Sequence, residues 1–575
     1  MTRLPPILFT LALLAATPMP AAAQTATGRW SATLQATPTV RLPLVVHIRA
    51  GEDGALIGTM DSLDQGALGI PLADIAAAGA TLSFNVPAVG GRYEGRWNAS
   101  AGSWAGNWTQ GGTSWPLILV AEAAPPPPPP PPADWTIPDD AAIGRLLEAR
   151  IAGRAGAGMV AAVIEPAGRR IVARGPAGAA PFDARTMFEI GSMTKVFTAL
   201  LLADMVRRGE VALTDPAARY LPEGARLPER GGRQITLADL ATHRSGLPRL
   251  PDDLASYDLV NPYADYSPAQ LLAFVGRHQL TRDIGSQWEY SNVGMGLLGD
   301  VLSRRAGMSY EALVRERITG PLGMNDTVIT LSDAQRARFA VPHDNFMRPT
   351  PLWDLPALAG AGALRSDAAD LLIFLSLALG EGPPDLVAAM QATTAQRWPG
   401  PGPRAETGLG WVILPAPAGA VMLHDGGTGG FRTAMAFEPG KRRAVILLTN
   451  AAVEPSATDL ALHLLIGTAP APVRPVPPAP DAGRTAIALP AEQLDRLVGR
   501  YVFSPALTVE ISRDGARLIA QATNAPRLPI HAQTPLDFFW RDIDAQIRFV
   551  PGADGRIASV VLRQDGQELT GQRTP

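Results

Sequence analysis

Two side chains with complementary chemistry stand three residues apart in the segment Phe188-Glu-Ile-Gly-Ser192-Met-Thr-Lys195. A serine hydroxyl becomes a good nucleophile only when a base accepts its proton. The apolar pattern from Val196 to Arg207 predicts a helix, and residues three apart at a helix start lie on one face. A lysine buried there would have a lowered pKa and could act as the base. The pair therefore predicts covalent chemistry, with Ser192 as nucleophile and Lys195 as its activator.

The basic residues of this chain strengthen the case for Lys195. All 50 of them except Lys195 and Lys441 are arginine. Arginine supplies a positive charge equally well but cannot give up its proton at accessible pH. A lysine that is kept against this background is expected to do what arginine cannot, which is to act as a base.

A second candidate site lies in Trp288-Glu-Tyr290-Ser-Asn292, just before the helical pattern from Met295 to Arg305. Tyr290 offers a phenol near the serine oxygen, and Asn292 offers an amide that can orient a substrate. The pKa of a phenol is near 10, so phenolate chemistry needs a positive neighbour. We expect Lys195 to be that neighbour.

A third candidate site is the glycine-rich segment Leu423-His424-Asp-Gly426-Gly427-Thr-Gly-Gly, which precedes a predicted strand from Thr433 to Phe437. Glycines let a substrate lie close to the backbone. A backbone N–H in this segment would complete an oxyanion hole, the pair of donors that stabilises negative charge on a reacting carbonyl.

Two proline-rich stretches divide the chain, and each predicts a stiff extended spacer. The region between them mixes helical patterns with short strands such as Val160–Ile164 and Arg443–Leu448, which predicts an α/β or α+β fold. Both flanking regions read as small all-β domains, with strand-like runs and Asp-Gly turns. The predicted organisation is a signal peptide (1–23), an N-terminal β domain (24–123), a linker (124–134), the central domain (135–470), a second linker (471–484) and a C-terminal β domain (485–575).

The first 23 residues have the features of a secretory signal peptide. Arg3 precedes an apolar run from Ile7 to Ala16, and small residues from Ala21 to Ala23 offer a cleavage site. Pro18 breaks the apolar run well short of the roughly 20 residues that a membrane span needs. We expect a cleaved, periplasmic or secreted protein with no membrane span.

The composition excludes several other classes of function. A net charge of −3 supplies no basic face for a nucleic acid, and the absence of cysteine rules out disulfides and thiolate metal sites. The seven histidines are scattered, so we expect no metal and no cofactor. The pattern Gly294-Met-Gly-Leu-Leu-Gly299 fits a dinucleotide motif, but it falls inside a predicted helix without a preceding strand. No Gly-x-Ser-x-Gly is present, which disfavours a Ser-His-Asp triad.

Together the three sites resemble the serine β-lactamase and penicillin-binding-protein family, especially class C β-lactamases and their esterase and D-aminopeptidase relatives. That family carries S-x-x-K, then Y-x-N, then K-T-G or H-x-G, in this chain order. Here the motifs are Ser192/Lys195, Tyr290/Asn292 and His424/Gly426. The resemblance spans about Ile143 to Ile466. The flanks resemble the small lipocalin-like β appendages of such enzymes.

The resemblance implies an antiparallel sheet flanked by helices beside a helical lobe. It also implies roles for the residues of the three motifs. Ser192 would form an acyl-enzyme, Lys195 and Tyr290 would shuttle its proton, and Asn292 would contact the substrate. The backbone N–H groups of Ser192 and Gly427 would hold the oxyanion.

His424 stands where class C β-lactamases carry a lysine that pairs with the substrate carboxylate. This difference favours an exported hydrolase acting on an ester, an amide or a D-amino-acid peptide. The alternatives are a β-lactamase or D,D-carboxypeptidase and, from another class, a catalytically idle binding or sensor protein. The expected partner is a small-molecule or peptide substrate. The sequence leaves the oligomeric state open.

Overall fold

The computed structural model describes residues 26–574 apart from 36–40, 52–53, 63–66, 111–112, 122–130, 133, 177, 179–180, 255–259, 403, 505–506, 524–526 and 565–566. The predicted signal peptide and most of the first predicted linker lie outside the described residues. The chain divides into two compact units, Met1–Pro127 and Pro128–Pro575, and each is described by itself.

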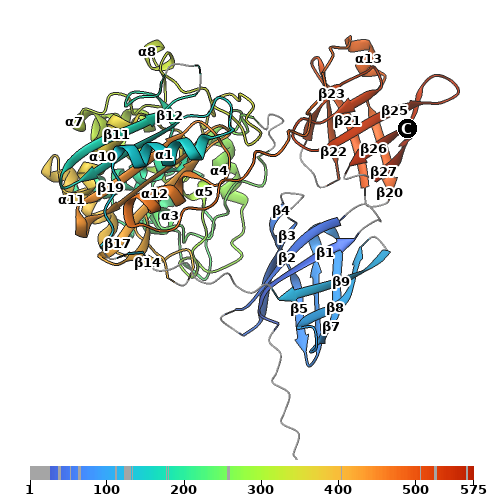
Figure 1. Ribbon diagram of the computed structural model, residues 1–575, viewed down its shortest axis with the longest axis horizontal. Helices are drawn as coiled ribbons and strands as arrows, with labels where there is room; N and C mark the ends of the chain where they lie inside the picture. Colours follow the sequence, from blue (N-terminus) through green and yellow to red (C-terminus); the bar gives the residue numbers. More distant parts are fainter. Residues whose placement is uncertain are drawn as a thin grey trace, which may run out of the picture. The chain divides into compact units, whose positions relative to one another are not determined.

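An antiparallel sheet of eight strands forms the centre of the region between residues 140 and 466 (Figure 1). Its order is β11-β10-β19-β18-β17-β16-β15-β14. The strands are β10 (Met159–Glu165), β11 (Gly168–Arg174), β14 (Trp398–Pro399), β15 (Glu406–Thr407), β16 (Val412–Ala416), β17 (Gly419–Gly427), β18 (Arg432–Glu438) and β19 (Arg443–Thr449). A separate short pair joins β12 (Phe188–Glu189) to β13 (Arg365–Ser366).

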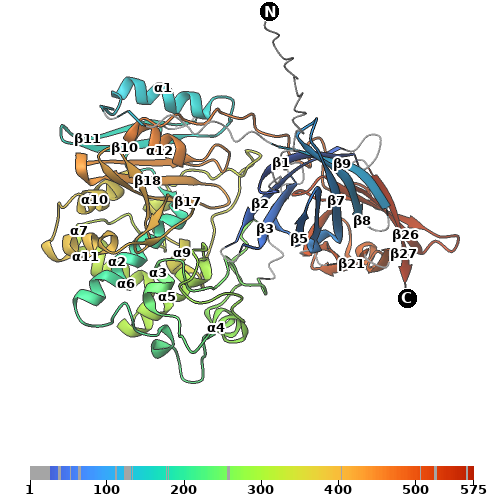
Figure 2. The same ribbon diagram turned by 90° about the horizontal axis from the view of Figure 1, so that it is seen from below.

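Helices cover both faces of this sheet. The α-helices between residues 140 and 466 are α1 (Asp140–Ile151), α2 (Thr194–Arg207), α3 (Leu237–Ala241), α4 (Pro268–Arg277), α5 (Asn292–Ala306), α6 (Tyr310–Val314), α7 (Gly320–Leu322), α8 (Asp333–Arg336), α9 (Ala359–Gly362), α10 (Ala368–Ala378), α11 (Pro384–Ala395) and α12 (Ala457–Ile466). Figure 2 shows α1 and α12 on one side of the sheet and α2, α5 and α10 on the other.

The two faces follow from the alternation of side chains along each strand. In β10, Met159, Ala161 and Val163 pack with α1 and α12. Residues between them, such as Val160 and Ala162, belong to the larger core shared with α2, α5 and α10. Because both faces are covered, the central strands are apolar throughout, which is why they appear in the sequence as short continuous apolar runs.

The described parts of the two flanking regions are mainly β-strands, with a 3₁₀ turn at Pro87–Val89 and one short α-helix. The N-terminal unit is an antiparallel sheet in the order β4-β3-β2-β1-β9-β8-β7-β6-β5, built from β1 (Gly28–Gln35), β2 (Arg41–Ala50), β3 (Leu56–Ser62), β4 (Ala67–Pro71), β5 (Ala73–Ala78), β6 (Thr81–Val86), β7 (Gly91–Asn98), β8 (Ser103–Gln110) and β9 (Thr113–Ala121). Its tryptophans and Tyr93 form the core.

The C-terminal region is a closed antiparallel barrel that follows the helix α13 (Ala491–Asp495). Its strands are β20 (Gly499–Ser504), β21 (Leu507–Asp514), β22 (Arg517–Ala522), β23 (Arg527–Ala532), β24 (Asp537–Phe539), β25 (Ala545–Pro551), β26 (Ile557–Gln564) and β27 (Gln567–Thr574). The predicted fold class, a mixed helix and sheet domain with all-β regions at both ends, is therefore confirmed.

Candidate active site

The nucleophile candidate lies in a single 3₁₀ turn that leads directly into α2. The turn spans Gly191–Met193, and Lys195 follows as the second residue of α2. Lys195 Nζ is 3.0 Å from Ser192 Oγ and donates a 2.6 Å hydrogen bond to the carbonyl oxygen of Ala361 in α9. Ser192 itself is partly exposed. One partner holds the amine in place, and the other is a hydroxyl that a substrate can reach.

Burial controls the protonation of Lys195, whose side chain is fully buried. Desolvation holds the pKa of Lys195 well below the usual 10.5, and the positive charge of Arg249 lowers it further, while Asp425 opposes the shift. A lysine in this setting loses its proton readily and then carries a lone pair 3.0 Å from the serine oxygen. The arrangement therefore has the geometry of a serine with its base, and the lowered pKa of Lys195 favours that role.

Tyr290 lies beside this pair and is braced by the loop that follows α3. The ring of His243 stacks on the ring of Tyr290 at 4.6 Å, and His243 Nδ1 accepts the Ser291 N–H at 3.1 Å. Lys195 Nζ is 4.8 Å from the centre of the Tyr290 ring. Two regions that are 48 residues apart in sequence thus position one phenol against the nucleophile.

The protonation of Tyr290 differs from the expectation that Lys195 would lower its pKa. Burial raises the pKa of Tyr290 above its ordinary value of 10, while a hydrogen bond to Ser192 and the charge of Arg249 oppose that shift. The physical reason is that desolvation penalises the phenolate and outweighs the opposing contributions of Ser192 and Arg249. Tyr290 is thus a phenol in the resting site, beside an amine whose pKa is lowered.

Asn292 is the first residue of α5, whose N-cap is Ser291. The Ser291 hydroxyl accepts the Gly294 N–H at 2.8 Å and donates to the carbonyl oxygen of Pro248 at 2.7 Å. These bonds fix the start of α5 and therefore the position of the Asn292 residue that carries the side-chain amide. Asn292 Oδ1 is buried and has no hydrogen-bond partner among the described residues. A buried acceptor without a partner is suited to a substrate N–H.

The third motif lies on β17, the strand packed against the nucleophile turn. A Cβ on Gly426 would lie 2.1 Å from the Ile190 carbonyl oxygen, so only glycine allows this approach. Thr433 of β18 donates to the same oxygen at 3.0 Å. The next residue, Gly427, is exposed at the end of β17. The contacts bring the backbone of Gly427 beside the turn that carries Ser192.

His424 is buried in the same strand, and its Nδ1 lies 2.7 Å from the carbonyl oxygen of Asp425. Burial and the nearby Lys195 lower the pKa of His424 to about 4. The imidazole is therefore uncharged at neutral pH. It cannot supply the positive charge that a lysine would place at this position.

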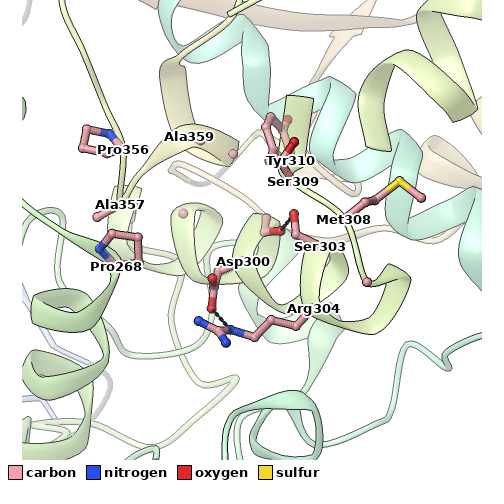
Figure 3. A pocket seen from close by; sticks show the side chains of 14 residues that line it. Pro268, Asp300, Ser303, Arg304, Met308, Ser309, Tyr310, Pro356, Ala357 and Ala359 are labelled. Carbon is pink, nitrogen blue, oxygen red and sulfur yellow. Dashed lines mark hydrogen bonds and ion pairs between the residues drawn. The ribbon is translucent and has the colours of Figure 1, made fainter. Parts of the chain in front are cut away.

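The dinucleotide-like pattern has a packing explanation. Its glycines lie inside α5, and a Cβ on Gly299 would lie 2.9 Å from Gly360 Cα of α9. This close packing holds α9, whose Ala361 accepts the Lys195 bond. A cavity of about 520 Å³ opens beside the same contact (Figure 3). There, Asp300 and Arg304 form a 2.6 Å ion pair with each other.

The described residues offer little support for other kinds of site. No group of three or more acidic or histidine side chains in these parts of the chain is arranged to hold a metal ion. Across the same residues, no helix has both the length and the apolar character required to cross a membrane.

Replacing Tyr290 by phenylalanine tests the role of the phenol. We expect acylation, deacylation or both to slow by about 10²- to 10⁴-fold, because the hydroxyl that contacts Ser192 is the removed group. Stopped-flow measurement of the burst and steady-state phases with a nitrophenyl ester separates the two steps. Tyr220→Phe, a tyrosine bonded to Asp215 far along the chain, is the matched control. Both rates within threefold of the native protein would remove Tyr290 from the chemistry.

Comparison with known proteins identifies the family. The sequence profile of the Beta-lactamase family matches residues 143–468, and that of a domain of unknown function, DUF3471, matches residues 483–573. The D-alanyl-D-alanine-carboxypeptidase/endopeptidase AmpH of Escherichia coli (strain K12) is 33% identical over 269 residues, which are 44% of this chain and 69% of the relative. Penicillin-binding protein 4 of Amycolatopsis lactamdurans is 30% identical over 331 residues, 52% of this chain and 84% of the relative.

A solved structure gives the same fold. The β-lactamase/D-alanine carboxypeptidase of Pseudomonas syringae matches with a TM-score of 0.50 at 21% identity, over 56% of this chain and 98% of that structure. The family profile covers more than half of the 575 residues, and its motifs lie together in space as described above. This chain belongs to the β-lactamase family of serine hydrolases.

Proposed function

We propose that the protein is an exported hydrolase that forms an acyl-enzyme on Ser192 and acts on D-amino-acid peptides and related small esters. The observation that carries this proposal is the 3.0 Å approach of the buried Lys195 amine to the Ser192 hydroxyl. Export is supported by the signal-like sequence at residues 1–23.

Acylation uses the Ser192 hydroxyl, the Lys195 amine and the Tyr290 phenol in turn. Lys195 accepts the Ser192 proton as Oγ bonds to the substrate carbonyl carbon, and the developing oxyanion is held by the N–H groups of Ser192 and Gly427. The bond to the leaving group then breaks. The Tyr290 phenol donates a proton to the departing nitrogen or oxygen and regains one from the Lys195 ammonium. Deacylation repeats the sequence with water as the nucleophile.

A substrate with an amide next to the scissile bond suits the site best. Asn292 Oδ1 is a buried acceptor without a partner in the described part of the chain, and leaving such an atom unpaired costs about 1–3 kcal/mol. A peptide N–H would pair with it. The relative AmpH, a D-alanyl-D-alanine-carboxypeptidase/endopeptidase, supports the same substrate class.

A substrate panel tests the proposal directly. Full-length protein is assayed with a nitrophenyl ester, a peptide ending in two D-alanines, its all-L counterpart and a cephalosporin. We expect hydrolysis of the ester and of the D-peptide, and little turnover of the cephalosporin or the L-peptide. Efficient cephalosporin hydrolysis would identify a β-lactamase instead, and no turnover of any compound would favour the idle binding protein.

His424→Lys tests why β-lactams are expected to be poor substrates. The imidazole is uncharged at neutral pH because its pKa is about 4, whereas a lysine there adds an amine that can pair with a substrate carboxylate. We expect KM for β-lactams to fall by about tenfold and ester turnover to drop. Steady-state kinetics on both substrates measure the change. Unchanged constants for both would mean that His424 only packs the strand.

A further inference from the structure

Arg249 places a free positive charge at the active site. Its guanidinium lies over the Tyr290 ring, 4.9 Å from the ring centre, and its side chain is exposed. Its backbone carbonyl accepts the Asn292 N–H at 3.0 Å, which ties the residue to the second motif. The structure records no ion pair or hydrogen bond of this side chain with any described residue.

The other basic groups of the site are not available for an anion. Lys195 is buried and bonded to Ala361 and Ser192. His424 is buried with Nδ1 against a backbone carbonyl. Arg432 donates to the carbonyl oxygens of Thr428 and Phe431 at 2.9 and 3.0 Å. Within the described residues, Arg249 is the one cation here that combines exposure with unused donors.

We propose that Arg249 is a specificity-determining residue that binds a carboxylate on the leaving-group side of the substrate. The guanidinium is planar, permanently charged and matched to a carboxylate by two parallel hydrogen bonds. It lies on the ring whose hydroxyl faces Ser192, so the bound carboxylate is only a few bonds from the scissile carbonyl. This recognition replaces the charge that the third motif lacks. The inference rests on the proposed Ser192 hydrolase.

Aromatic side chains border the same position. The charge of Arg249 opposes the rise that burial causes in the pKa of Tyr263, which places the two groups close together. Tyr263 packs edge-on against Trp353 at 5.0 Å, and Trp353 in turn lies against Gly429 of the third motif. Both rings are partly exposed.

Two aryl esters that differ only in charge test the proposal. Both carry N-acetylglycine as the acyl group, and the phenol carries a meta carboxylate in one and a meta carboxamide in the other. We expect Arg249→Gln to lower the ratio of kcat/KM for the carboxylate ester to that for the carboxamide ester by about 10- to 100-fold. Arg249→Lys should keep part of the preference. Arg145→Gln, an exposed arginine of α1, is the matched control.

The ratio separates recognition from electrostatics. Loss of the Arg249 charge also raises the pKa of Lys195, but that effect slows both esters alike. In the native protein, raising the salt concentration from about 0.05 to about 0.5 M should lower kcat/KM for the carboxylate ester only, because salt screens its attraction to Arg249. The salt measurement uses the native protein alone, so it remains a valid test even if Arg249→Gln folds poorly.

Two results would overturn the proposal. The first is an equal loss on both esters in Arg249→Gln, with no selective salt effect in the native protein. That result would leave the hydrolase intact and show that Arg249 only tunes Lys195. The second is hydrolysis of neither ester by the native protein, which would remove the proposed function itself and this inference with it.

Discussion

Ser192→Ala should lose at least about 10³-fold in kcat on any ester or peptide that the native protein hydrolyses. The change removes the oxygen that we propose bonds to the substrate carbonyl, so neither the acyl-enzyme nor a burst should form. The removed hydroxyl lies in a partly exposed turn rather than in the core, so the fold should persist. Steady-state and burst kinetics, with circular dichroism as the folding check, measure both effects.

A second serine provides the control for that change. Ser376 is buried in α10 and its hydroxyl bonds to the Leu372 carbonyl oxygen at 2.8 Å. Ser376→Ala should keep the native rate. A Ser192→Ala protein that retained a native-like rate would place the nucleophile elsewhere in the chain.

Lys195→Arg should cost about 10²- to 10⁴-fold in kcat/KM, although the charge is kept. Arginine cannot release its proton, so the base is lost, and a bulkier guanidinium must occupy a fully buried position. Lys195→Met removes the base while retaining an apolar stem of similar length, and it should be equally slow. Lys441→Arg, the same substitution at the other lysine of the chain, should leave the rate unchanged.

The pH profile separates a base from an electrostatic partner. The unprotonated amine is the active form, so kcat/KM should rise with pH through the pKa of Lys195 and level off above it. Burial lowers that pKa, so the rise should occur well below pH 10.5. Retention of more than about a tenth of the native rate in Lys195→Arg would mean that Lys195 supplies charge and not proton transfer.

Local sequence patterns predicted the elements that carry the motifs. The helical pattern from Val196 to Arg207 corresponds to α2, which begins two residues earlier, and the predicted strand from Thr433 to Phe437 corresponds to β18. Both are predominantly apolar runs, a feature that local residues determine. The three sites were identified because the motifs of Ser192, Tyr290 and His424 follow one another along the chain in the order that the family uses.

Tertiary contacts account for what sequence reasoning missed. The Lys195 partner Ala361 lies 166 residues away and has no side chain that marks it. Arg249 could not be singled out, because nearly every basic residue of this chain is an arginine. His243 supports Tyr290 by stacking on its ring, a contact between residues far apart in the sequence. The rise in the pKa of Tyr290 depends on burial, which no local pattern reports.

Covalent trapping tests the central claim most directly. Native full-length protein is incubated with a fluorophosphonate or a penicillin, and the product is analysed by intact mass and peptide mapping. We expect one adduct per chain, located on Ser192, and no adduct in Ser192→Ala. An adduct on another residue, or turnover of substrate with no adduct at Ser192, would contradict that claim.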